Sequence, residues 1–72
     1  MARQDSSKIL AENILRLRTE RNWSQEDCAE KCRLHRTYIG AVERGERNIT
    51  LASLDKIAAA FGILPIELLK KK

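Results

Sequence analysis

The chain has 72 residues, the size of one small domain, and hydrophobic residues make up 43% of it, which is a globular composition. No apolar run is long enough to span a membrane, and the polar N-terminus lacks the pattern of a signal peptide, so we expect a cytoplasmic protein. The net charge of +4 is compatible with a polyanionic partner and equally with a solvated basic surface.

A first helix is predicted to begin at Ser6 or Ser7, since either residue can cap a helix N-terminus. Three apolar residues recur at helical spacing and should face the core: Leu10, Ile14 and Leu17. Ile9 and Leu15 lie off this stripe, so we expect them to be exposed or covered by a partner. Asn22 suits the left-handed position that ends a helix.

Residues 24–48 are predicted to form two short helices joined by a tight turn. Ser24 can cap the first of them, and Asp27 can complete a capping box three residues later. Its inward positions are small and apolar: Cys28, Ala29 and Cys32. The second helix should span about residues 36–44, with Ile39 and Val42 facing inward and Gly45 ending it.

The outer face of that second helix combines polar and small residues, which we predict to be Arg36, Thr37, Gly40, Ala41 and Arg44. Charge is sorted between the two helices, because residues 24–32 are net acidic and residues 33–47 are net basic. A random soluble surface need not show such sorting, so the second helix is the better candidate for a polyanion contact.

A fourth helix is predicted after Thr50, which can cap it, and before Gly62, which can end it. Its apolar stripe is Leu51, Leu54, Ile57, Ala58 and Phe61. Pro65 can begin a short fifth helix. We therefore predict one all-α domain of five helices over residues 1–72, in which residues 50–70 serve packing and dimerisation.

Apolar residues of the last helix remain uncovered in this arrangement and suggest a homodimer. The predicted interface is formed by the uncovered residues Leu64, Ile66 and Leu69, together with Phe61 near them at the end of the fourth helix. Because a chain of this size buries only about 60% of its unfolded surface, association of two copies would also add to a thin core.

The residues at 24–48, SQEDCAEKCRLHRTYIGAVERGERN, resemble the lambda-repressor-like (Xre) helix-turn-helix family. The matching runs are SQED at 24–27, TYI at 37–39 and VERG at 42–45, and the similarity extends over about residues 10–69. Residues 34–48 are similar to controller proteins of restriction-modification systems, which are small homodimeric regulators. The resemblance implies a sequence-specific transcription regulator that binds a palindromic operator in duplex DNA, without a cofactor.

In such a motif the second helix enters the major groove, and its first residues meet the base edges. Base contacts are therefore expected from Arg36, Thr37, Tyr38, Gly40 and Ala41. Arg36 is the best reader, because its guanidinium can donate to both acceptors of a guanine. The ring of Tyr38 can equally be a half-buried packing group. Phosphate contacts are expected from Gln25, His35, Arg44, Arg47 and Asn48.

The resemblance also implies a partly buried ion pair between Arg18 and Glu43, which would join the first and third helices. Two positions depart from the family pattern. Arg33 stands where relatives usually have a glycine in the turn, and His35 stands where they usually have a capping serine or threonine. These departures leave the shape of the turn open.

Cys28, Cys32 and His35 do not predict a metal centre, because a structural zinc site needs four ligands and the chain has no further cysteine or histidine. Two cysteines one helical turn apart are also poorly placed for a disulfide. The single histidine has no positioned nucleophile beside it, so we expect no enzyme.

Three other functions stay open for this sequence. An antitoxin on the same fold would use its exposed apolar residues to bind a toxin protein. A protein-interaction module on the same fold would have lost DNA binding, since a fold does not fix a function. Binding to a membrane surface through the basic tail and the apolar last helix is the third, although we expect no membrane partner.

Overall fold

The computed structural model describes residues 6–71, which form four α-helices followed by a 3-10 helix. The elements are α1 (Ser6–Glu20), α2 (Gln25–Cys32), α3 (Arg36–Glu43), α4 (Leu51–Phe61) and η1 (Pro65–Leu69). The predicted all-α class is confirmed over these residues, whereas the expected fifth α-helix is a 3-10 helix. Its five residues are too few for a regular α-helix, and Glu67 N–H donates to Leu64 O three residues back.

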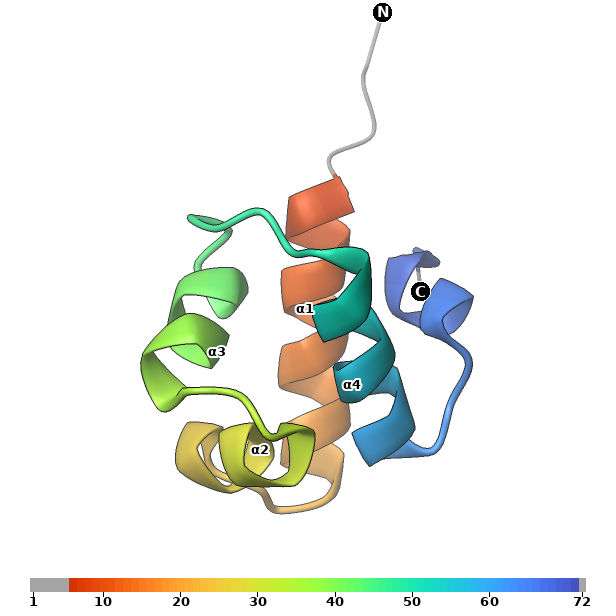
Figure 1. The fold of residues 1–72 in the computed structure, drawn as a ribbon. Helices are drawn as coiled ribbons and strands as arrows, with labels where there is room; N and C mark the ends of the chain where they lie inside the picture. Colours follow the sequence, from red (N-terminus) through yellow and green to blue (C-terminus); the bar gives the residue numbers. More distant parts are fainter. Residues whose placement is uncertain (1–5, 72) are drawn as a thin grey trace, which may run out of the picture.

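The central element is α1, with α3 on one side, α4 and η1 on the other, and α2 at the end where α1 finishes (Figure 1). Packing between elements follows this order, because α1 contacts α3 and η1, while α2 contacts α3 and α4. No helix among the described residues is long and apolar enough to cross a membrane.

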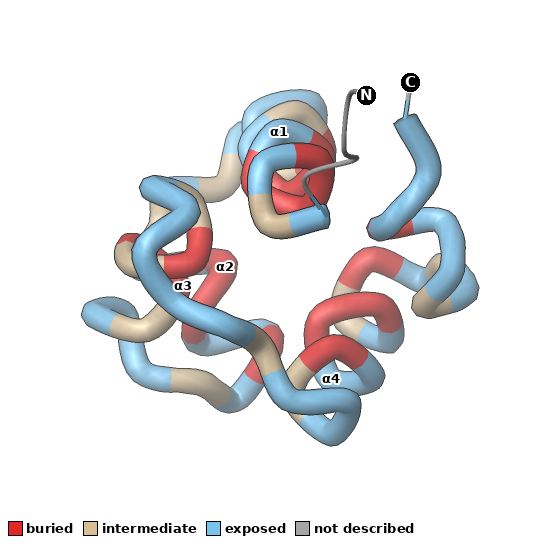
Figure 2. Tube along the Cα trace, turned by 90° about the horizontal axis from the view of Figure 1, so that it is seen from above, coloured by how far each residue is buried: buried red, intermediate tan, exposed pale blue. Residues whose placement is uncertain are grey.

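The core lies between the helices and draws apolar side chains from every element. Seen from above, the buried segments of α1, α2, α3 and α4 turn toward the centre, whereas the connecting loops are largely exposed (Figure 2). The largest fully enclosed side chains are Ile14, Ile39, Ile57, Leu68, Val42, Cys28 and Cys32. The inward positions predicted for α2 and α3 are therefore confirmed.

The predicted core stripe of α1 is confirmed, because Leu10, Ile14 and Leu17 are all buried. Leu15 is exposed, as expected. Ile9 is buried, so the expectation that it lies outside is wrong. The reason is that α1 packs against η1 as well as α3, which widens its buried face beyond one stripe. Both serines expected as caps, Ser6 and Ser7, lie inside the helix.

The predicted caps of α4 are present, since the hydroxyl of Thr50 accepts a hydrogen bond from Ser53 N–H at 3.0 Å and Gly62 is left-handed with φ 73°. Four of the five predicted stripe residues are buried: Leu54, Ile57, Ala58 and Phe61. Leu51 is 79% exposed, so its predicted burial is wrong. It is the first residue of α4, directly after the loop. Periodicity predicts which face of a helix is apolar, but it does not show whether a neighbouring element covers the end of that face.

Candidate nucleic-acid interface

The first helix of the motif is fixed at its start by a reciprocal pair of hydrogen bonds, which confirms the predicted capping box. Asp27 N–H donates to Ser24 Oγ at 2.9 Å, and Ser24 N–H donates to Asp27 Oδ2 at 3.0 Å. The pKa of Asp27 lies below its usual 3.8, mainly because its carboxylate accepts the hydrogen bond from the backbone of Ser24. The contact with the side chain of Ser24 lowers this pKa further. The carboxylate thus stays charged at the positive end of the α2 dipole.

The turn between α2 and α3 forms with Arg33 in the left-handed conformation, at φ 59° and ψ 41°. Its N–H donates to the carbonyl of Glu30 at 3.2 Å, and Leu34 N–H donates to that of Ala29 at 2.9 Å, which satisfies the end of α2. The turn therefore has the shape that a glycine would give, at a cost of about 1–2 kcal/mol for a residue with a Cβ.

His35 caps α3, as its place before the helix requires. Its Nδ1 accepts a hydrogen bond from Thr37 N–H at 3.1 Å. An accepting ring nitrogen carries no proton, so the cap needs the tautomer that is protonated at Nε2. His35 thus replaces the capping serine or threonine of the relatives, and a ring nitrogen takes the place of the hydroxyl oxygen as the acceptor. The turn itself is not changed by this replacement.

The N-terminal turn of α3 presents polar side chains to solvent. Arg36 and Thr37 are both exposed, directly after the capping residue. The guanidinium of Arg36 pairs with Glu26 of α2 at 3.5 Å, and both side chains are largely exposed. Such a pair contributes little to stability, so Arg36 can leave Glu26 for another acceptor at small cost.

Gly40 was expected on the outer face of α3, and this expectation is wrong because the residue is buried. A Cβ at this position would lie 3.2 Å from Arg44 Nη1 and 3.4 Å from Gln25 Oε1. Two long side chains therefore cover the backbone of α3 here, one of them from α2. The part of this covering that Gln25 supplies was not visible from the sequence, since it comes from another helix, whereas Arg44 lies only four residues after Gly40. Ala41, also expected outside, is half-buried.

Tyr38 lies between the core and the loop after α3. Its ring packs against the hydrophobic core and is half-buried, and the guanidinium of Arg47 lies over the ring at 5.3 Å. Its hydroxyl oxygen is buried and has no hydrogen-bond partner among the described residues. Of the two interpretations of Tyr38, the packing ring agrees with this position.

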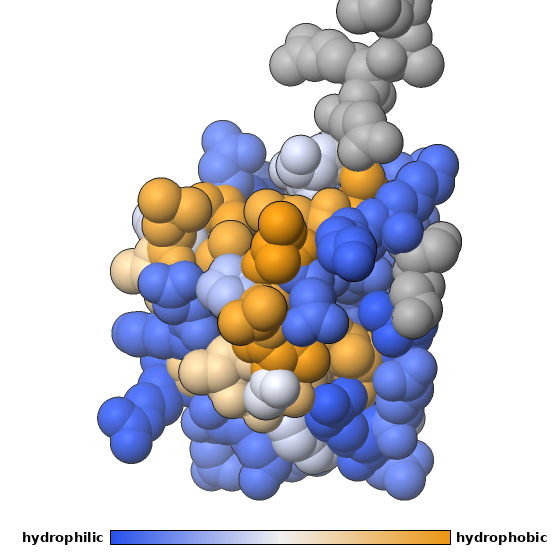
Figure 3. All heavy atoms as spheres, turned by 90° about the vertical axis from the view of Figure 1, so that its right-hand side faces the viewer, coloured by the Kyte–Doolittle hydropathy of each residue, from blue (hydrophilic) through white to orange (hydrophobic). Residues whose placement is uncertain are grey.

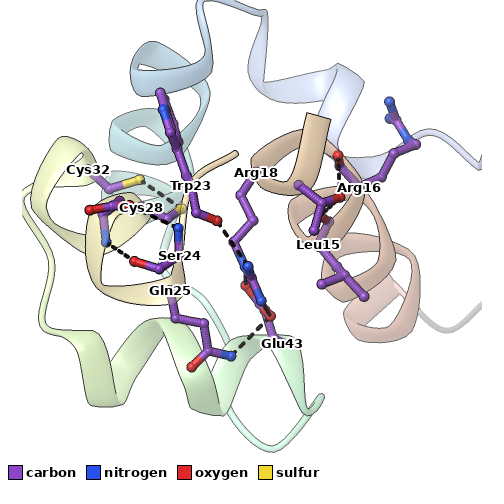
Figure 4. A network of polar contacts seen from close by, with 11 residues as sticks. Leu15, Arg16, Arg18, Trp23, Ser24, Gln25, Cys28, Cys32 and Glu43 are labelled. Atoms are coloured by element: carbon purple, nitrogen blue, oxygen red, sulfur yellow. Dashed lines mark hydrogen bonds and ion pairs between the residues drawn. The ribbon is translucent and has the colours of Figure 1, made fainter. Parts of the chain in front are cut away.

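The predicted ion pair between Arg18 and Glu43 is present and links α1 to the end of α3. Arg18 donates from Nε to Oε2 at 2.6 Å and from Nη2 to Oε1 at 3.1 Å. It also donates from Nη1 to the carbonyl of Trp23 at 3.1 Å. The hydrogen bond with Glu43 raises the pKa of Arg18. A third helix joins the network, because Gln25 Nε2 donates to Glu43 Oε1 at 3.1 Å (Figure 4).

The basic residues after α3 lie on the surface. Arg44, Arg47 and Asn48 are all exposed, and Arg44 Nε pairs with Glu46 Oε1 at 3.0 Å. Arg36, Arg44 and Arg47 thus give α3 exposed cationic groups at both ends of its buried middle, and Asn48 adds an exposed amide. Groups of this kind at both ends of a helix can hold it against a phosphate backbone.

The surface over α4 and η1 is partly apolar (Figure 3). Leu64, Ile66 and Leu69 are exposed by 65%, 63% and 40% of their area, in agreement with the prediction. Phe61 is only 5% exposed, so its expected place in this surface is wrong. Its ring stacks on Trp23 with centroids 5.4 Å apart, and this stacking keeps it in the core.

Asn13 is the structural residue that the sequence analysis missed. It is a buried polar residue of α1, and its Nδ2 donates to the carbonyls of Leu68 at 2.7 Å and Lys70 at 2.9 Å. These bonds hold η1 and its apolar surface against α1. The available signal was its position three residues after Leu10 and four after Ile9, on a face that is otherwise apolar.

The two cysteines are free thiols buried in α2, with their sulfur atoms 3.9 Å apart. This contact lowers the pKa of Cys28, because its thiolate accepts a hydrogen bond from the S–H of Cys32. The same contact raises the pKa of Cys32, and burial raises it further. Cys32 therefore remains a neutral thiol. No group of three His, Cys, Asp or Glu residues within residues 6–71 is arranged to hold a metal ion.

Sequence comparison relates the chain to known regulators. Residues 14–69 match the model of the helix-turn-helix family. A hypothetical transcription factor from Neisseria meningitidis serogroup B is 46% identical over 66 residues, which are 92% of this chain and 62% of that protein. Control protein C.SmaI from Serratia marcescens is 48% identical over 68 residues, 94% of this chain and 81% of that protein. The chain thus spans less than two thirds of the Neisseria relative.

Solved structures of relatives have the same fold. The crystal structure of the Neisseria transcription factor NHTF superposes with a TM-score of 0.92 at 44% identity, over 94% of this chain and 76% of that one. Restriction-modification controller protein C.Esp1396I was solved as a tetramer in complex with its natural 35 base-pair operator; it gives a TM-score of 0.80 at 32% identity, over 92% and 87% of the two chains. The protein described here belongs to the helix-turn-helix family, and control proteins of this kind are among its relatives.

Proposed function

We propose that this protein is a sequence-specific transcription regulator that binds a palindromic site in duplex DNA as a homodimer. The observation that carries the proposal is the N-terminal turn of α3, where Arg36 and Thr37 are exposed directly after a capped helix start. A helix in the major groove meets the bases with its first residues, so these two side chains are where base readout would begin.

Arg36 is the proposed reader of a guanine in each half-site. Its guanidinium is exposed, and its partner Glu26 is an exposed carboxylate on α2 that it can leave. Thr37 can bond a base or place its methyl group against thymine. Gly40 has no open surface for a base, and Ala41 can offer only a small apolar contact.

Phosphate contacts are proposed for the residues that flank α3 and open α2, namely Gln25, His35, Arg44, Arg47 and Asn48. The exposure of the last three supports this assignment. Gln25 adds the N-terminus of α2, where backbone N–H groups and the helix dipole favour an anion. The base contact expected from Tyr38 is not part of this proposal, because its ring packs inward.

The proposed dimer uses the apolar surface of Leu64, Ile66 and Leu69, which a second copy of the chain would cover. A two-fold dimer presents two α3 helices to DNA about one helical turn apart. The operator complex of C.Esp1396I, a relative with the same fold, supports a multimeric DNA-bound form. Relatives named as control proteins support a role in controlling restriction-modification genes.

Selection of bound duplexes from a random DNA pool tests the proposal, with wild type and Arg36→Ala in parallel. We expect a palindrome from wild type and the loss of one fixed guanine per half-site from the variant. If no motif emerges and binding only fades with salt, then contact is confined to phosphates and the proposed readout is wrong.

A further inference from the structure

The side chain of Gln25 is held at the junction of α2 and α3 by a buried carboxylate. Its Nε2 donates to Glu43 Oε1 at 3.1 Å, and the Glu43 side chain is only 7% exposed. The same carboxylate accepts two hydrogen bonds from Arg18. Figure 4 shows Arg18 of α1 and Gln25 of α2 reaching this carboxylate at the end of α3. One acidic group thus fixes a side chain on each of the other two helices.

The chemistry of this contact allows one orientation of the Gln25 amide. A carboxylate only accepts hydrogen bonds, so the NH₂ group and not the carbonyl oxygen must face Glu43. The reverse orientation would bring two acceptor oxygens together inside a partly buried site, where an unmade bond is costly. Oε1 is thereby directed over α3, 3.4 Å from where a Cβ of Gly40 would lie.

Arg18 makes this arrangement rigid. Two parallel charge-assisted bonds hold the Glu43 carboxylate, and the third bond, to the carbonyl of Trp23, holds the guanidinium itself. A glutamate held in this way presents its Oε1 at a fixed point. The amide of Gln25 is therefore oriented before any ligand arrives.

We infer that Glu43 is a positioning residue for the DNA contact of Gln25, and that Arg18 acts through it. The inference rests on the proposed function, because it concerns how the start of α2 meets DNA. The amide NH₂ group carries two donors, of which Glu43 takes one. Since Gln25 is half-exposed, the second donor can meet a DNA acceptor in an orientation already set. A side chain ordered in advance improves affinity by about two- to tenfold.

The orientation is tested by the side-chain amide signals of Gln25 in ¹⁵N-correlated NMR spectra of the whole chain. We expect one proton in wild type to be shifted and slowed in exchange by the carboxylate. The double variant Arg18→Met, Glu43→Leu replaces both partners of the pair by apolar groups, which commonly preserves folding. It should return both protons to the positions of a solvated glutamine. Signals that do not change would overturn the inference.

Arg16 and Glu20 supply the matched control, because they form an exposed ion pair on α1. Arg16→Gln with Glu20→Gln also removes one positive and one negative charge and should leave the Gln25 signals unchanged. Should the apolar pair fail to fold, Arg18→Lys provides the second variant. It keeps the charge but cannot make two parallel bonds, so a smaller shift of the same signals is expected.

Binding to a duplex selected by wild type then tests the consequence. Gln25→Ala should weaken binding more in wild type than in the Arg18→Met, Glu43→Leu background, by a factor of about two to ten, because only wild type orders the amide in advance. An equal loss in both backgrounds would mean that Glu43 does not position Gln25. A wild type that selects no duplex would instead refute the proposed function itself, so the two failures are distinct.

Discussion

Arg33 shows how one residue can be kept in a conformation that its side chain disfavours. It is left-handed and exposed at the turn between α2 and α3. Arg33→Gly should therefore raise the unfolding free energy by about 1 kcal/mol, since relief of the strain of about 1–2 kcal/mol exceeds the greater chain entropy of an unfolded glycine. Urea denaturation measures the change.

Glu30→Gly supplies a control of opposite sign for this variant. Glu30 is exposed inside α2, where glycine costs about 1 kcal/mol relative to good helix formers. If Arg33→Gly destabilised the protein as Glu30→Gly does, the left-handed turn would carry no strain.

Asp27 makes a specific prediction about pH. Its pKa is held below the usual 3.8 by the bonds from Ser24, so the charged form is bound more favourably in the folded chain than in the unfolded chain. The stability it contributes is complete above pH 3.8 and is lost as pH falls through the lowered folded value. The difference in unfolding free energy between wild type and Asp27→Asn should therefore shrink below pH 3.8. A difference that is constant with pH would contradict the capping role.

At the scale of the elements, Asn13 attaches η1 to α1, and this contact can be tested by mutation. Asn13→Ala removes the two bonds to the carbonyls of Leu68 and Lys70 and should cost about 1–3 kcal/mol, because a buried acceptor is left unpaired. Glu12→Ala changes an exposed neighbour on the same helix and should have little effect. Urea denaturation of both variants makes the comparison, and equal effects would exclude the attachment role.

The helices could largely be predicted from local sequence, because capping residues next to them in the chain determine where they begin. Ser24 and Thr50 cap α2 and α4 through their own hydroxyl groups, so short-range chemistry fixed those boundaries. The misplaced residues depend on other elements instead. Ile9 is buried because η1 lies beside α1, and Leu51 is exposed because no other element within residues 6–71 covers its side chain. Periodicity gives the face of a helix but not the extent to which neighbours cover it.

Site residues whose placement depends only on their own position in a helix could be predicted from the sequence. Contacts between side chains of different helices could not. Arg36 is exposed at the start of α3, as the motif required. The hydrogen bond from Gln25 to Glu43, and the part of the covering of Gly40 that Gln25 supplies, arise only when α2 is laid across α3. Their residues are 15 to 18 positions apart in sequence, and no spacing rule connects them.

At the scale of the whole molecule, the apolar surface over η1 predicts the oligomeric state. Ile66→Asp places a charge in the proposed interface and should convert the dimer to monomer in sedimentation velocity, because an unpaired carboxylate resists burial. Leu51→Asp is the matched control, since Leu51 is more exposed than Ile66 and lies outside the proposed interface. Equal effects of the two changes, or a dimer that withstands Ile66→Asp, would rule out this interface.

The central claim is that the start of α3 reads DNA through Arg36. The most direct measurement is a cycle of binding affinities that combines wild type and Arg36→Ala with a selected operator and its 7-deazaguanine analogue, which lacks the N7 acceptor. We predict that the analogue weakens wild-type binding about tenfold, which corresponds to roughly 1.4 kcal/mol, and leaves Arg36→Ala unaffected. Equal sensitivity of both proteins, or no sensitivity in wild type at any guanine of the site, would contradict it.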